Sequence, residues 1–80
     1  MSEKKEEGRT IHLDVNGLEP PEPMVRILEA ASALGSGDAL VVEHFREPVP
    51  LYAHLEAAGF THEIARLSES RWRLTVRRGR

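Results

Sequence analysis

The fold of this chain is decided by the stretch Gly17-Leu18-Glu19-Pro20-Pro21-Glu22-Pro23-Met24-Val25-Arg26, which joins a predicted strand to a predicted helix. Gly17 permits a sharp turn, because glycine adopts backbone conformations that other residues avoid. Proline is tolerated in the first turn of a helix and not in its interior, so Pro20, Pro21 and Pro23 mark where this helix begins. The stretch therefore sets both the end of the first strand and the start of the first helix.

Hydrophobic periodicity predicts the elements on either side of this stretch. Strict alternation of apolar and polar residues indicates a half-buried strand over residues 10–15, and apolar residues at helical spacing indicate a helix over residues 21–34. The more uniformly apolar residues 39–44 predict a more central strand. Pro48 and Pro50 mark the start of a second helix that is expected to run to about residue 58.

Two further strands, over residues 60–67 and 71–77, are separated by a short turn and predict an antiparallel hairpin. Gly35 and Gly59 are expected to close the two helices in the left-handed conformation. The residues expected to face the core are Ile11, Leu13, Val15, Met24, Ile27, Leu28, Ala31, Leu34, Leu51, Leu55, Ala58, Trp72, Leu74 and Val76.

The element order β-α-β-α-β-β predicts an α+β fold, a two-layer α/β sandwich with a four-stranded mixed sheet. A strand-helix-strand unit implies parallel strands joined by a right-handed crossover, so both helices are expected on one face. The other face meets water with Thr10, His12, Asp14, Glu43, Arg71, Arg73 and Thr75. We expect one domain over residues 10–77, with a disordered charged tail over residues 1–9 and a basic C-terminal tail over residues 78–80.

Composition excludes several classes of function. Among the 80 residues there is no cysteine, which removes disulfides, thiolate metal sites and cysteine nucleophiles. A net charge of −2 argues against a general nucleic-acid binder. No apolar run is long enough to span a membrane, and the charged N-terminus lacks the apolar segment of a signal peptide, so a bacterial-type cytoplasmic protein is expected.

Two loops are the candidate functional site. The loops that follow parallel strands emerge at the same edge of a sheet, where ligands of open α/β sheets bind, and here they are residues 16–20 and 44–48. His44 is either a general base or metal ligand, or a structural histidine bonded to Glu22, Glu47 or the backbone. Arg46 either binds a phosphate or carboxylate or pairs with a nearby acid.

The same stretches carry a family resemblance. A β-α-β-α-β-β domain with Gly17-Leu18 followed by Pro21-Glu22-Pro23 at the first helix resembles the TusA/SirA-like small sulphur carriers. Their motif is Gly-Leu-x-Cys-Pro-x-Pro, in which the cysteine holds a persulfide, and here Pro20 stands at that position. The chain resembles more closely an uncharacterised bacterial branch of that fold, which shares the segment His44-x-Arg46-Glu47-Pro48-Val49-Pro50-Leu51. The resemblance implies that domains of this branch lie beside, or are fused to, hemerythrin-like or nitrogen-oxide metabolism domains.

The leading hypothesis is a non-enzymatic adaptor or ligand-binding module that engages a protein partner, or a small anionic or redox-active ligand, without a cofactor. Its candidate binding residues are Glu22, His44, Arg46 and Glu47, and its structural motif residues are Gly17, Leu18, Pro20, Pro21, Pro23 and Pro48. The absence of phosphate-loop, nucleophile–base and paired-carboxylate motifs argues against an enzyme. The alternatives are metal-dependent or acid/base catalysis at His44 with Glu22 and Glu47, a scaffold in sulphur relay, and RNA binding through the C-terminal arginines.

Overall fold

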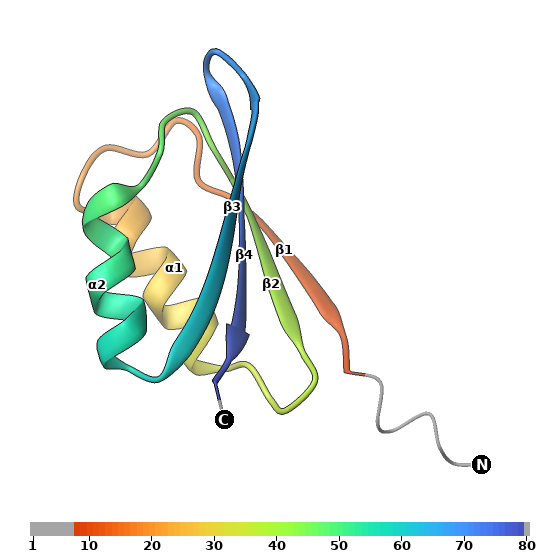
Figure 1. Ribbon diagram of the computed structural model, residues 1–80. Coiled ribbons are helices and arrows are strands. Elements are labelled where there is room, and N and C mark those ends of the chain that lie inside the picture. Colours follow the sequence, from red (N-terminus) through yellow and green to blue (C-terminus); the bar gives the residue numbers. More distant parts are fainter. Residues whose placement is uncertain (1–7, 80) are drawn as a thin grey trace.

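The computed structural model describes residues 8–79, and its elements follow the predicted order (Figure 1). The predictions that fall on residues 1–7 and Arg80 lie outside the described residues. No helix in the described part of the chain is both long and apolar enough to cross a membrane. The elements are β1 (Thr10–Asp14), α1 (Glu22–Ser32), β2 (Ala39–His44), α2 (Val49–Ala57), β3 (Phe60–Ser68) and β4 (Arg71–Arg78).

The four strands form one mixed sheet in the order β1-β2-β4-β3, so the predicted fold class is confirmed. β1 lies parallel to β2, whereas β4 is antiparallel to both β2 and β3. The first and third strands are the edges, and the apolar β2 is internal as its composition indicates. Figure 1 shows α1 and α2 side by side on one face of the sheet, which leaves the other face uncovered.

The core lies between that helical layer and the sheet. It consists of side chains from one face of β2 and β4 and from one stripe along each helix. Side chains return to the same face every two residues along a strand and every 3.6 residues along a helix, so each element buries one side. Burying these aliphatic side chains is the main favourable term for a chain of this size. The fully buried large side chains are Val15, Ile27, Leu40, Val42, Leu51, Leu55, Leu74 and Val76.

Four local expectations are wrong. α1 ends at Ser32 rather than Leu34, and Gly35 is not in the left-handed region; that conformation occurs in the following turn at Gly37, with φ 90°. Ala58 is exposed because it caps the C-terminus of α2, after the last full turn. Trp72 is only half-buried, and the guanidinium of Arg66 lies 5.3 Å from its ring centroid, because their strands pair at the edge of the sheet.

Prolines start both helices in the same way. Pro21 is the N-cap of α1 and Pro23 follows at the second helical position; Pro48 and Pro50 take the same places in α2. Gly17, with φ 88°, makes the turn that sends the chain from β1 towards α1, as expected. The two proline-bearing helix starts therefore lie next to each other, beyond the ends of two adjacent parallel strands.

The uncovered face of the sheet carries charge pairs between neighbouring strands. Nε of Arg73 donates to a carboxylate oxygen of Glu43 at 2.8 Å, and Arg71 approaches the other oxygen at 3.8 Å. These arginines are thus partly neutralised by an acid of the neighbouring strand, as is usual for exposed cross-strand pairs.

Candidate functional site

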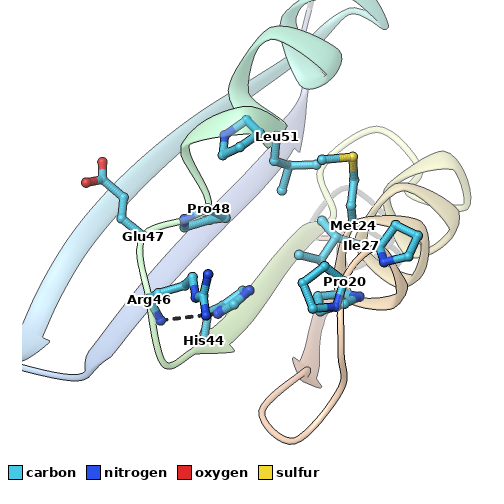
Figure 2. A pocket seen from close by; sticks show the side chains of 11 residues that line it. Pro20, Met24, Ile27, His44, Arg46, Glu47, Pro48 and Leu51 are labelled. Carbon is cyan, nitrogen blue, oxygen red and sulfur yellow. Dashed lines mark hydrogen bonds between the residues drawn. The ribbon is translucent and has the colours of Figure 1, made fainter.

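A pocket of about 220 Å³ opens where the two helix starts meet the end of β2 (Figure 2). The chain has five prolines, and all five line it. Carbon surfaces dominate the walls, because proline presents its ring and has no N–H to donate. The lining residues are Pro20, Pro21, Pro23, Met24, Ile27, His44, Arg46, Glu47, Pro48, Pro50 and Leu51.

Parallel pairing of β1 with β2 brings the two predicted loops together. Asp14 is paired with Glu43 at the carboxyl ends of these strands, so the segments that follow leave the sheet in the same direction. Figure 2 shows Pro20 from the first loop facing His44, Arg46 and Pro48 from the second. The pocket therefore lies at the edge of the sheet where the sequence predicted the site.

His44 ends β2 with its side chain on the helical side, as the alternation along the strand predicts. It is 7% exposed. Its Nδ1 accepts a hydrogen bond of 3.2 Å from the backbone N–H of Arg46, so in the neutral ring the proton lies on Nε2. Burial, and secondarily the positive charge of Arg46, lower the pKa of His44, which favours the neutral imidazole.

Arg46 supplies a cation at the rim of the pocket. Its guanidinium lies 4.8 Å from the ring centroid of the exposed Phe45, in a cation–π arrangement. Within residues 8–79, Arg46 forms no ion pair with an acid. The acids near Arg46 in sequence are engaged elsewhere, because Glu43 is paired with Arg73 and Glu47 accepts a hydrogen bond from Tyr52.

Glu47 turns its carboxylate away from the pocket, as Figure 2 shows. Its Oε2 accepts a hydrogen bond of 3.0 Å from the hydroxyl of Tyr52, one turn into α2. Burial, together with this hydrogen bond and the negative charge of Glu47, raises the pKa of Tyr52 to about 12. The phenol ring in turn stacks on His62 of β3, with centroids 4.5 Å apart, so Glu47 belongs to the contact between α2 and the sheet.

Glu22 does not join the other candidate residues. Its carboxylate pairs with Arg26 at 2.9 Å, one turn further along α1, and both side chains are about half exposed. Among residues 8–79 no three His, Asp or Glu side chains are placed to share a metal ion. The predicted combination of His44, Glu22 and Glu47 around a metal is therefore not assembled.

The helix starts also offer few free backbone donors. The N–H of Glu22 donates to the carbonyl of Glu19 at 2.8 Å, and the N–H groups of Val49 and Leu51 donate to the carbonyls of Glu47 and Pro48. The second helical position is proline in each helix and has no N–H. An anion bound by helix N-termini alone is therefore disfavoured here.

Sequence reasoning missed the apolar wall of the pocket. Met24, Ile27 and Leu51 were expected only as core residues, yet each also lines the pocket. The signal that was available is the shared spacing of Pro21 with Pro23 and of Pro48 with Pro50, which predicts two similar, rigid helix starts.

Comparison with known proteins gives a family and no described function. No curated protein and no solved structure matches the chain. The family model described as an uncharacterized conserved protein, DUF2249, matches residues 12–78, which include every strand and helix apart from the first two residues of β1. The chain therefore belongs to the DUF2249 family of uncharacterized conserved proteins.

Proposed function

We propose that this domain is a non-enzymatic binding module whose pocket receives an apolar group, either of a small ligand or of a partner protein. The observation that carries the proposal is the pocket of about 220 Å³ walled by all five prolines together with Met24, Ile27 and Leu51. A concave, mostly apolar site with a few polar groups is the usual form of a ligand site. Rigid proline walls lose little conformational entropy on binding.

The polar residues support binding over catalysis. His44 is one hydrogen-bonded imidazole, and the acid among the pocket-lining residues, Glu47, is engaged by Tyr52. A general base needs a positioned partner or a reacting group within hydrogen-bond reach, and a metal site needs three or more ligands. This favours the adaptor or ligand-binding hypothesis over acid/base or metal-dependent catalysis.

We further propose a distant relationship to the TusA/SirA-like carriers, as a bacterial cytoplasmic protein without the sulphur chemistry. The element order and the Pro21-Glu22-Pro23 frame support it, while Pro20 stands at the persulfide position. On this view Pro20 forms part of the apolar wall of the pocket at the position where the carriers hold their persulfide. The partner that the resemblance suggests is a hemerythrin-like or other redox protein.

A methyl NMR titration tests the pocket directly. The chain has three isoleucines; Ile27 lines the pocket, whereas Ile11 and Ile64 are partly buried residues that pack against the core and do not line the pocket. With ¹³C-labelled isoleucine δ1 methyls, benzyl alcohol and xenon are expected to shift the Ile27 signal saturably and leave the other two in place. A Kd on the order of 1 mM is expected for benzyl alcohol, given the affinity available to so few atoms.

Matched variants on α1 provide the control. Met24→Trp fills the pocket from its wall and is expected to abolish the Ile27 shift. Val25→Trp adds the same side chain at the adjacent, 44% exposed position, which does not line the pocket, and is expected to keep it. If neither probe shifts Ile27 saturably in the unmodified chain, the pocket is not a binding site and the proposed function fails.

A further inference from the structure

The polar end of the pocket contains hydrogen-bond donors and no free side-chain acceptor. Nδ1 of His44 is taken by the backbone N–H of Arg46, so the ring offers its Nε2–H. The guanidinium of Arg46 offers several N–H groups and cannot accept. The carboxylate of Glu47 is turned outward and bonded to Tyr52, so it does not compete for these donors.

These two donors lie at one place. Figure 2 shows the ring of His44 directed from the end of β2 towards Pro20, with Arg46 beside it. Both residues line the pocket, and Met24, Ile27 and Leu51 form its opposite, apolar part. The site therefore combines an apolar body with a donor-only, positively charged end.

We infer that the pocket selects a small carboxylic acid with an apolar body, whose carboxylate accepts hydrogen bonds from Arg46 and from Nε2 of His44. This inference rests on the proposed binding function and names the class of ligand. Arginine binds carboxylates through two parallel hydrogen bonds, and such charge-assisted bonds are stronger than neutral ones. The volume of about 220 Å³ lies below the ~300–1,000 Å³ of drug-sized sites, which limits the body to about one ring.

Two other candidate ligand classes fit the pocket less well. A phosphate or sulfate would leave the apolar walls unfilled and would find few free backbone N–H groups at the helix starts. A cation would meet the guanidinium of Arg46 with no opposing acid facing into the pocket. The carboxylate is thus selected by charge and the apolar body by the prolines.

The test compares benzoate with benzyl alcohol, which has the same ring and no charge, on the full chain by the Ile27 methyl shift. Benzoate is expected to bind about tenfold more tightly, a difference of about 1.4 kcal/mol, because its charged carboxylate forms stronger hydrogen bonds with these donors than a neutral hydroxyl does. Arg46→Gln is expected to weaken benzoate binding until the preference over benzyl alcohol is gone. Arg77→Gln makes the same charge change at the far end of β4, opposite Ala39, and is expected to keep the preference.

The outcomes separate this inference from the proposed function. Binding of benzyl alcohol with no preference for benzoate, or a preference that survives Arg46→Gln, would overturn the carboxylate assignment and keep the apolar pocket. Loss of binding of both compounds and of xenon would overturn the proposed function itself. A peptide ending in phenylalanine that binds more tightly than benzoate, with the same dependence on Arg46, would overturn the assignment to a free acid and assign the carboxylate to a partner's chain end.

Discussion

Substitution of His44 by asparagine and by alanine separates its structural role from its role in the pocket. The Nδ1 atom of His44 accepts the N–H of the residue two positions on, which is the bond that an asparagine side chain makes in an Asx-turn. His44→Asn therefore keeps an acceptor for the Arg46 N–H and removes only the outer part of the ring. His44→Ala removes both the acceptor and the buried ring.

The expected loss of unfolding free energy follows from these contacts. For His44→Asn it is about 1 kcal/mol, from the apolar ring surface that is no longer buried. For His44→Ala it is about 2 to 3 kcal/mol, because the loop bond is also lost and the amide of Arg46 must find water instead. His44 is 7% exposed, so most of its ring surface contributes.

Urea unfolding followed by far-UV circular dichroism at about pH 8, where the imidazole is neutral, measures both values. His12→Asn and His12→Ala are the matched controls, because His12 is exposed on the uncovered face of β1, and each is expected to change stability by less than about 0.5 kcal/mol. Equal destabilisation by asparagine and alanine at position 44 would refute the role assigned to the loop bond. A change of urea m-value would show that the unfolded or folded state itself had altered.

The remaining predictions concern pH and the core. Because the pKa of His44 is lowered in the folded state, the unfolded chain binds more protons than the folded chain below pH 6.5. The contribution of neutral His44 to stability is therefore fully present above pH 6.5 and is lost as the pH drops below 6.5 towards the folded pKa. His44→Asn should flatten this part of a Tm–pH profile. The chain has one tyrosine, so ultraviolet titration of Tyr52 should show ionisation near pH 12, and Glu47→Gln should lower that pKa only partly, because burial is its largest cause. Since Tyr52 favours its neutral form in the fold, stability should fall as the pH rises from 10 towards 12. Leu74→Ala, at a fully buried site in β4, should cost about 3 kcal/mol in urea unfolding, and a loss below about 1 kcal/mol would contradict the packing.

Much of the fold could be predicted because its elements have strong local signals. The alternation of Ile11, Leu13 and Val15 and the clean alternation of Trp72, Leu74 and Val76 each specify a strand with one buried face. Prolines cannot lie inside a helix, so they locate both helix starts. Helix ends have weaker sequence signals than helix starts, because several residues before Gly35 fit either a last helical turn or a loop. In the structure α1 ends at Ser32.

The candidate site was predictable in position and less so in character. The sequence indicated that residues 16–20 and 44–48 meet, and that His44 points towards the helices, because parallel strands and alternation require it. It did not indicate that Glu22 pairs with Arg26 or that Glu47 pairs with Tyr52, because each acid had several partners within reach. The choice between them depends on side-chain geometry across α1 and α2.

By itself, the sequence determined the element order, the faces of the strands and the proline-marked helix starts, since these depend on local backbone sterics and on periodicity. Only the tertiary structure decided that all five prolines surround one pocket and that its polar end keeps donors alone. The physical reason is that a pocket is the space left between segments distant in sequence. Its volume depends on how those segments pack, and its charge depends on which of their polar groups form hydrogen bonds with one another.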